Sequence, residues 1–253
     1  MKLFELENRL NSWLQPAMFK DYCPNGLLID AVGGGDSEIS KVVTGVSLRH
    51  DLIDAAVDAG AQAIVVHHPN WFWNSDKDKR IVENKGEYVR RLIKEGISLF
   101  GYHLPLDAHP AIGNNAVLCR MILGKPFTVE LTNWFMDDIG CIETGDVSGE
   151  ILDRVFPKGY RAYNFTPEKR SYIVGICTGS GTSGLQEALD CGCTMFITGE
   201  IHESTPIFAK ENDIAVIAAG HHRTEIFGVQ WLADWIDNLN GVSAEFIDID
   251  NPE

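Results

Sequence analysis

The stretch that decides the fold is Ala63-Ile-Val-Val-His-His-Pro69, a short apolar run that leads directly into His67 and His68. Its β-branched residues are typical of a strand buried on both faces of a parallel sheet. In open α/β sheets, binding sites lie beyond the carboxyl ends of the strands. The stretch therefore predicts an α/β fold with two imidazoles at a strand end, where they could bind a metal ion or a phosphate or take part in a proton transfer. For this pair alone, the alternative is two polar residues that simply close a strand.

The pattern around this strand recurs in the second half of the chain. Residues 42–47, 55–60 and 63–68 have counterparts in 172–177, 187–192 and 195–200. The next expected strand ends at His103 and is followed by Asp107, and its counterpart ends at His221 and is followed by Glu225. Both segments have the order strand, histidine, three residues and carboxylate, so the match indicates a duplication. We therefore expect two related α/β domains, residues 1–127 and 128–253.

Helical spacing and glycine stops define several further elements. Apolar residues recur with helical periodicity over 3–14, and three more helices are expected over 51–59, 85–95 and 114–123, ending at Gly60, Gly96 and Gly124. Strands are expected over 41–46 and 97–103, and a short helix near 150–156. The segment 70–80 is interpreted as a polar loop whose three aromatics line a pocket or an interface, or pack beneath the loop.

Composition restricts the class of protein. The 253 residues are 45% hydrophobic and 23% charged, as in an ordinary globular protein. A net charge of -15 opposes non-specific binding to nucleic acid or an anionic membrane, and suits a multivalent cation. The N-terminus lacks the apolar region of a signal peptide, and no run approaches the roughly 18 apolar residues of a membrane span. Six cysteines without a Cys-x-x-Cys pair favour reduced thiols and a cytoplasmic location.

Four expected strand ends carry candidate metal ligands. These residues are His67, His68, His103, Asp107, Glu200, His202, His221, His222 and Glu225. Imidazole nitrogen with carboxylate oxygen suits Zn, Fe, Mn, Co or Ni, and the lack of thiolates argues against a zinc finger. The set is large enough for two ions bridged by a carboxylate and water, which is the usual hydrolytic arrangement. Separate polar strand ends are the alternative.

Two other kinds of site have weaker support in the sequence. A Ser-His-Asp triad needs a Gly-x-Ser-x-Gly elbow, which is absent at the expected strand ends. The turn Thr178-Gly-Ser-Gly-Thr-Ser-Gly184 lies between a strand and a helix, so its N–H groups could hold a phosphate, although it lacks the lysine of a phosphate loop. A plain turn is the alternative. Near Glu225, Thr224 is expected to cap the last helix and to place Glu225 in its first turn.

At these residues the chain resembles the Nif-three-like dinuclear metal-centre family, whose bacterial members carry the name GTP cyclohydrolase 1 type 2 homolog. The motifs span nearly the whole chain in order. They are Asp21-Tyr-Cys-Pro-Asn-Gly-Leu27, Val43-Thr-Gly-Val46, Ile64-Val-Val-His-His-Pro69, Tyr102-His-Leu-Pro-Leu-Asp-Ala-His-Pro110, Gly113-Asn-Asn115, Cys177-Thr-Gly179, Phe196-Ile-Thr-Gly-Glu200 and Ala219-Gly-His-His-Arg-Thr-Glu225.

The resemblance implies a two-domain α/β subunit in a toroidal homohexamer, with two divalent metal ions between the domains. Its ligand set corresponds to His67, His68, Asp107, His221 and Glu225, with Glu225 as the bridge. His103 and His222 are then candidates for moving protons. One departure is Pro69, because many members have a glycine after the two histidines, so the substrate contacts are not carried over.

The leading expectation is a cytoplasmic dinuclear-metal hydrolase in which activated water attacks a purine nucleotide or a similar substrate. The first alternative is a metal-handling protein, for iron in particular, or a scaffold, in either case without turnover. The second is a DNA-repair-associated toroid, which the net charge of -15 opposes unless basic residues gather on the ring lining. The sequence does not assign roles to Glu200, His202 or the 178–184 turn.

Overall fold

The computed structural model describes residues 1–72, 80–127, 131 and 133–251. The chain divides into two compact units. Unit 1 contains Met1–Leu106 and Val229–Asp250, and unit 2 contains Asp107–Gly228. Among the described residues, no helix is long and apolar enough to cross a membrane.

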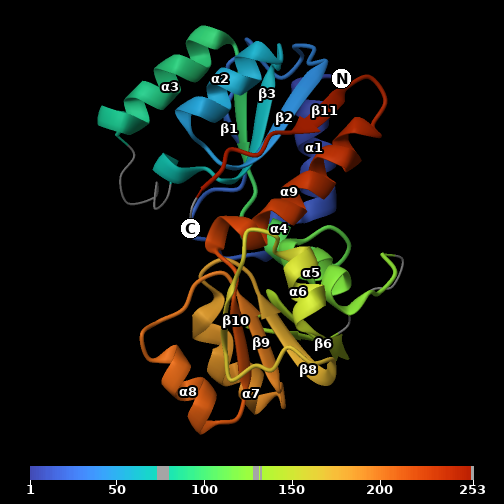
Figure 1. Cartoon of the computed structure of the whole chain (residues 1–253). Helices are drawn as coiled ribbons and strands as arrows, with labels where there is room; N and C mark the ends of the chain where they lie inside the picture. The colour runs from blue at the N-terminus through green and yellow to red at the C-terminus, as the bar shows by residue number, and fades with distance from the viewer. Residues whose placement is uncertain (73–79, 128–130, 132, 252–253) are drawn as a thin grey trace. The chain divides into compact units, whose positions relative to one another are not determined.

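Unit 1 is built on a five-stranded sheet in the order β1-β4-β3-β2-β11 (Figure 1). Strands β2, β3, β4 and β11 run parallel, and β1 is antiparallel at the edge beside β4. Their bounds are β1 Gly26–Ile29, β2 Lys41–Ser47, β3 Ala63–His68, β4 Ser98–Gly101 and β11 Ser243–Phe246. Every residue of β3 is buried, as predicted for a strand covered on both faces.

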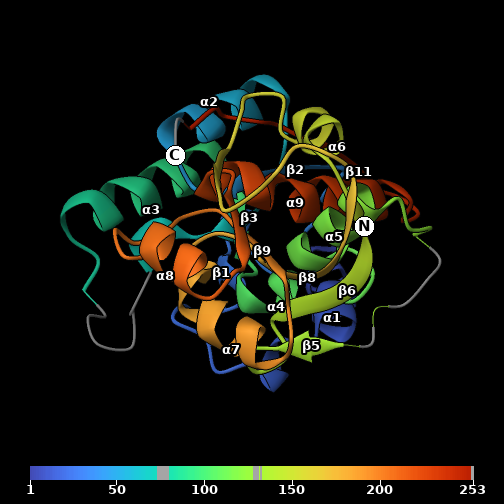
Figure 2. The same ribbon diagram turned by 60° about the horizontal axis from the view of Figure 1, so that its bottom comes forward.

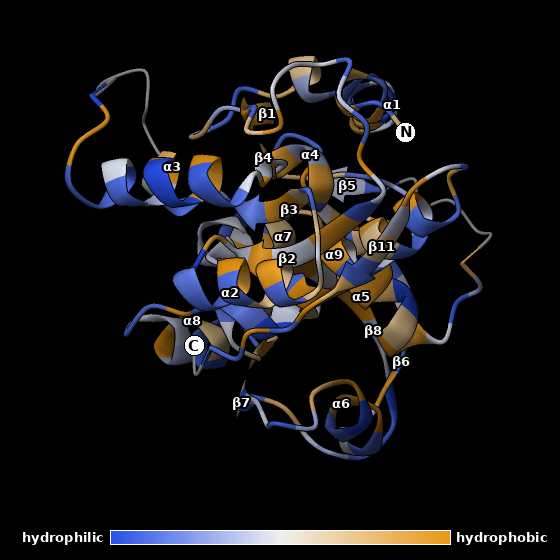
Figure 3. Ribbon diagram, turned by 90° about the horizontal axis from the view of Figure 1, so that it is seen from above, coloured by the Kyte–Doolittle hydropathy of each residue, from blue (hydrophilic) through white to orange (hydrophobic). Residues whose placement is uncertain are grey.

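Helices cover both faces of this sheet, and alternate residues of its strands face opposite ways. On one face, α2 (His50–Asp58) and α3 (Glu83–Glu95) pack over a core that contains Val43 and Ile64. On the other, Thr44 Oγ1 donates to the carbonyl of Val229 in α9 (His221–Asp237) at 2.8 Å. The hydroxyl of Tyr102 donates to Asn11 of α1 (Leu3–Leu14) at 2.8 Å. In Figure 3, α3 is hydrophilic over most of its length, as suits a surface helix.

Three short elements complete unit 1: η1 (Pro16–Met18), η2 (Asn70–Phe72) and α4 (Leu104–Asp107), whose last residue belongs to unit 2. Phe72 is buried in the core beneath α3, and the ammonium of Lys85 lies 5.3 Å from its ring centroid. Of the predicted aromatic loop, Phe72 therefore packs in the core, and residues 73–79 lie outside the described residues.

Unit 2 is built on a six-stranded sheet in the order β5-β6-β8-β9-β10-β7. Strands β8, β9 and β10 are parallel, and the flanking strands are antiparallel. Figure 2 shows α7 and α8 on one side of the parallel strands and α5 and α6 on the other. The bounds are α5 Asn114–Leu123, β5 Trp134–Phe135, β6 Gly140–Val147, α6 Gly149–Val155, β7 Arg161–Tyr163, β8 Arg170–Cys177, η3 Gly181–Gly184, α7 Leu185–Asp190, β9 Met195–Thr198, α8 Thr205–Glu211 and β10 Ala215–Ala218.

The two units repeat one arrangement. The order β2-α2-β3-α3-β4 in unit 1 corresponds to β8-α7-β9-α8-β10 in unit 2, and both strand triplets are parallel. An antiparallel strand also lies beside the third strand in each unit, β1 beside β4 and β7 beside β10. This topology agrees with the duplication predicted from sequence, and the α/β fold with two related units is confirmed.

The limits of the units differ from the predicted division into 1–127 and 128–253. The first segment of unit 1 ends at Leu106, and its second segment is Val229–Asp250 near the C-terminus. Helix α5 therefore belongs to unit 2. Val229–Asp250 belongs to unit 1 because β11 pairs in parallel with β2, the strand at the edge of the predicted first domain. The N-terminal ammonium also donates to the carbonyl of Gly241 at 2.8 Å.

Several local predictions agree with the structure. The helices expected over 3–14 and 114–123 have those bounds, and α2 and α3 begin one and two residues earlier than expected. Gly60, Gly96 and Gly124 follow their helices with φ of 71°, 66° and 62°. These are left-handed angles that glycine adopts without steric cost. Helix stops are therefore determined locally by the sequence.

Candidate metal centre

Three histidines gather at the carboxyl end of the unit 1 sheet. His67 and His68 are the last residues of β3, and His103 comes two residues after β4. Because β3 and β4 are parallel neighbours, these ends lie at one edge of the sheet. The three imidazoles offer nitrogen atoms within 4.8 Å of one another. Unit 1 thus brings together two predicted ligands and one predicted catalytic histidine.

Each of these imidazoles has a partner at Nδ1. Nδ1 of His67 lies 3.1 Å from the carbonyl oxygen of Tyr102, which can only accept, so His67 carries its proton on Nδ1 and its lone pair on Nε2. Nδ1 of His68 lies 3.1 Å from the hydroxyl of Ser47. Nδ1 of His103 lies 2.7 Å from Asp21 Oδ1. Histidine ligands of metals are commonly oriented by a partner on the other ring nitrogen, so this arrangement fits Nε2 ligands.

Asp21 is a residue of this cluster to which the sequence assigned no role. Its carboxylate also accepts from the side chain of Asn25 and the N–H of Leu104, both at 2.9 Å. Burial alone would raise the pKa of Asp21, but the contact with His103 and the two other hydrogen bonds lower it to about 2. Nearby Cys23 is a poor ligand, because burial and the charge of Asp21 raise the pKa of its thiol.

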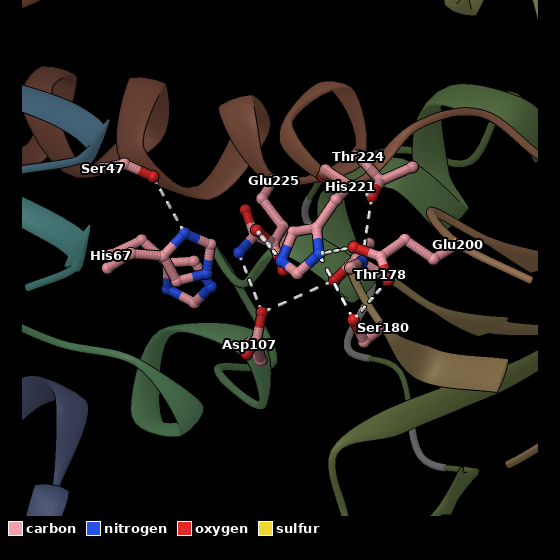
Figure 4. Close-up of polar contacts among 12 residues, drawn as sticks. Ser47, His67, Asp107, Thr178, Ser180, Glu200, His221, Thr224 and Glu225 are labelled. Atoms are coloured by element: carbon pink, nitrogen blue, oxygen red, sulfur yellow. Dashed lines mark hydrogen bonds and ion pairs between the residues drawn. The ribbon is translucent and has the colours of Figure 1, made fainter. Parts of the chain in front are cut away.

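In unit 2, His221 and Glu225 lie on one face of α9. The helix begins at His221, so the two residues are one turn apart, with Nε2 of His221 3.2 Å from Oε2 of Glu225 (Figure 4). The expected N-cap at Thr224 is wrong, because Thr224 lies inside the helix. Its hydroxyl donates back to the carbonyls of His221 and Gly220 at 2.9 and 3.1 Å. Glu225 therefore lies in the second turn of α9, where its side chain contacts His221 four residues earlier.

Asp107 is the third predicted ligand in unit 2, and it is 6% exposed. Its Oδ1 accepts from the side-chain amide of Asn114 at 2.9 Å and from the hydroxyl of Thr178 at 3.5 Å. Glu225 is 3% exposed. Burial and the charges of these two carboxylates raise the pKa of Cys177, so its thiol stays neutral. Unit 2 thus holds two buried acids in surroundings that suit a cation.

His221 is held by a carboxylate at each ring nitrogen. Glu200 Oε1 lies 2.5 Å from Nδ1, and Glu225 Oε2 lies 3.2 Å from Nε2 (Figure 4). Burial lowers the pKa of His221, but the two carboxylates outweigh it and raise the pKa to about 9. Nε2 of His221 and Oε2 of Glu225 therefore face each other at a position where one metal ion could bind both residues. The donor set fits a divalent cation, which would displace a proton from His221.

The 178–184 turn packs tightly against these acids. Gly179 has φ of 59°, and a Cβ there would lie 2.1 Å from Oε1 of Glu225. The carbonyl of Gly179 accepts from the N–H groups of Gly199 and Glu200 at 3.0 and 2.9 Å. Its own N–H donates to Thr224 at 3.0 Å. Because carboxylates face the turn, it suits a cation and not the phosphate considered from sequence.

Ser180 does not form a catalytic triad with His221. Its hydroxyl donates to Glu200 Oε2 at 2.9 Å and lies 3.4 Å from Nδ1 of His221, the same nitrogen that Glu200 contacts. In a triad the serine and the acid contact opposite ring nitrogens. This geometry agrees with the absence of a nucleophile elbow in the sequence.

Two further predicted residues lie elsewhere. His222 is buried, but successive helical positions are rotated by about 100°, so it does not share the face of His221 and Glu225. His202 is exposed, and its N–H donates to Thr205 Oγ1 at 3.1 Å. The sequence assigned no role to Glu200. Its side chain contacts the predicted ligand His221, because β9 and β10 are neighbouring strands, and strand pairing cannot be read from the linear sequence.

A family model described as Duf34/NIF3 (NGG1p interacting factor 3) matches residues 1–252. The chain belongs to this family. Proteins named GTP cyclohydrolase 1 type 2 homolog from Vibrio cholerae serotype O1 and Escherichia coli K12 are 36% and 35% identical to this Duf34/NIF3 chain over 263 and 271 residues, with both chains covered fully. The family resemblance inferred from the sequence motifs is thereby confirmed.

Solved structures share the Duf34/NIF3 fold. A structure titled protein ybgI, of unknown function, matches with a TM-score of 0.86 and 34% identity over the whole of both chains. A protein from Thermus thermophilus matches with a TM-score of 0.84 and 29% identity, also over both whole chains. The two-unit α/β architecture is therefore common to this chain and these relatives.

Proposed function

We propose that this Duf34/NIF3 protein is a metal-dependent hydrolase that holds two divalent cations with His67, His68, Asp107, His221 and Glu225. The observation that carries the proposal is the His221–Glu225 pair, whose Nε2 and Oε2 atoms lie 3.2 Å apart and could share an ion. Buried imidazoles with oriented Nδ1 atoms in unit 1 support it. Imidazole and carboxylate together suit Zn, Fe, Mn, Co or Ni.

We also propose that the donor sets of both units serve one centre, as the family resemblance implies. We assign Glu225 as the bridging ligand, because an anionic carboxylate offsets repulsion between two dications and a neutral imidazole does not.

Bound cations would supply Lewis-acid chemistry, which polarises the substrate and makes water a better nucleophile at neutral pH. Asp21 contacts Nδ1 of His103 at 2.7 Å and so fixes the orientation of an imidazole beside the donors His67 and His68. His103 is therefore our candidate for the proton transfer that accompanies attack and departure of the leaving group. His222, which is buried on another face of α9, is the second candidate.

The substrate class that we propose is a purine nucleotide or a similar compound. Support comes from the name GTP cyclohydrolase 1 type 2 homolog, which the relatives carry. We also propose that the chain assembles as a toroidal homohexamer, as the family resemblance implies. Sedimentation at micromolar concentration tests the assembly, and a stable monomer would contradict it.

A metal-handling protein, for example for iron, is the second candidate function. It is favoured by the burial of the donors, since His67 and His68 are 0% and 8% exposed, and buried ligands retain an ion. A DNA-repair toroid is less favoured, because a net charge of -15 repels nucleic acid.

Metal analysis of the purified protein followed by a purine-nucleotide turnover screen with each candidate ion separates these functions. Two ions per chain with turnover that Glu225→Gln abolishes supports the hydrolase. Bound metal without turnover by any of the ions supports metal handling. Turnover that persists after the metal has been removed by a chelator would contradict the metal-dependent mechanism.

A further inference from the structure

We propose that Glu200, supported by Ser180, is the positioning residue that fixes which nitrogen of His221 binds metal. This inference rests on the proposed metal site at His221 and Glu225. Oε1 of Glu200 lies 2.5 Å from Nδ1 of His221, so this nitrogen carries the proton and Nε2 faces Glu225. Without an acceptor at Nδ1, the neutral imidazole is free to place its proton on Nε2, where it would block the metal.

The backbone of Glu200 is fixed although its side chain is 48% exposed. Glu200 lies two residues after β9, and its N–H donates to the carbonyl of Gly179 at 2.9 Å. The hydroxyl of Thr182 donates to the carbonyl of Glu200. These two hydrogen bonds fix the N–H and the carbonyl of Glu200, so its side chain extends from a fixed backbone position.

The carboxylate itself is fixed by two contacts that use different oxygens. Oε1 contacts His221, and Oε2 accepts from the hydroxyl of Ser180 at 2.9 Å (Figure 4). Ser180 comes from the 178–184 turn, whose Gly199 contact at 3.0 Å ties it to the same strand end. The Gly- and Ser-rich turn therefore helps to hold the carboxylate of Glu200 against His221, a role that needs no bound phosphate.

The internal repeat gives independent support. His103 and His221 follow β4 and β10 by two and three residues, and both have a carboxylate at Nδ1. In unit 1 that acid is Asp21, which precedes β1, whereas in unit 2 it is Glu200, which follows β9. The same contact is thus made from two unrelated positions in the chain. Each repeat thus orients the histidine that follows its third strand with a carboxylate at Nδ1.

The decisive experiment measures zinc affinity on the full chain. Metal-free protein is titrated with Zn²⁺ in competition with a chromophoric chelator for Glu200→Ala, Glu200→Gln and Glu203→Ala. Loss of a partner that orients a metal ligand typically weakens affinity roughly 10- to 100-fold, which is the expected result for Glu200→Ala. Glu200→Gln keeps a carbonyl oxygen that can accept from Nδ1, so a smaller loss is expected. Glu203 is an exposed acid on the same loop, so Glu203→Ala removes the same charge and should bind zinc like the wild type.

A spectroscopic readout separates positioning from a structural role. Nitrogen-15 NMR of the zinc-loaded wild type should show His221 protonated on Nδ1, with partial loss of that tautomer in Glu200→Ala and its recovery in Glu200→Gln. Should Glu200→Ala fail to fold by circular dichroism, Glu200→Gln and Ser180→Ala carry the test. Wild-type zinc affinity in Glu200→Ala, or an equal loss in Glu203→Ala, overturns the inference.

The outcome is distinguishable from failure of the proposed function. If Glu225→Ala loses zinc while Glu200→Ala binds it normally, the metal site stands and the positioning role falls. If Glu225→Ala and His221→Ala both keep full zinc stoichiometry, the metal site itself is refuted and the positioning role with it.

Discussion

Gly179 offers a sharp test of the site, because its missing side chain makes room for Glu225. In Gly179→Ala, the new Cβ would lie 2.1 Å from Oε1 of Glu225 and 3.1 Å from Nε2 of His221. Contacts to Cβ below 3.0 Å are essentially never found, so Oε1 must move by about 0.9 Å or more. Metal–ligand distances tolerate only about 0.2 Å, so the displaced carboxylate can no longer share an ion with His221.

Two effects of Gly179→Ala can be given magnitudes. A left-handed φ of 59° costs an alanine about 1–2 kcal/mol of folding free energy. The loss of metal affinity should be larger than the roughly 10- to 100-fold that an indirect partner causes, because a ligand itself is displaced. We therefore expect a modestly less stable, folded protein that binds at most one ion per chain.

A matched control separates the two effects. Gly124 follows α5 with φ of 62°, and a Cβ there has nothing within 4 Å. Gly124→Ala should therefore lose a similar 1–2 kcal/mol in urea unfolding of the metal-free protein and keep full metal binding. Zinc titration and plasma emission metal analysis of both variants provide the comparison. Two ions bound with normal affinity by Gly179→Ala would refute the placement of Glu225 as a ligand.

Three further predictions follow from the charges. Glu225→Gln should reduce metal occupancy from two ions to one or none and abolish any hydrolytic activity while the far-ultraviolet circular dichroism is unchanged; metal analysis showing two ions would leave Glu225 an ordinary helix residue. Because the pKa of His221 is raised to about 9, a metal must displace its proton at neutral pH. Apparent zinc affinity should then rise about tenfold per pH unit between pH 6 and 8 and level off above about 9, and an affinity independent of pH in titrations over that range would count against the assignment. The pKa of Asp21 is lowered from 3.8 to about 2, so its contribution of about 2 kcal/mol is present above pH 4 and is lost as pH falls through 2. In urea unfolding, Asp21→Asn should be less stable than the wild type by about that amount at pH 7, with the difference shrinking towards pH 2; equal stabilities at pH 7 would contradict the contact with His103.

The sequence alone determined the elements whose signals are local. The run that ends in His67 and His68 is a strand buried on both faces, and glycine stops placed the ends of α2, α3 and α5. Strand period, helix period and the left-handed preference of glycine act over a few residues, so they can be read in a line of sequence. The repeat extended this reading to the matching elements of the second unit, and with it to His221 and Glu225.

The tertiary structure decided which distant residues meet. Asp21 reaches His103 across 82 positions, and Glu200 reaches His221 across 21. β11 joins β2 from the other end of the chain, which moved the limits of the units away from residue 127. A hydrogen bond between remote segments depends on sheet order and strand register, and neither leaves a periodic trace in the residues that take part. For that reason the candidate ligands could be proposed from the sequence, whereas the carboxylates that contact His103 and His221 could not.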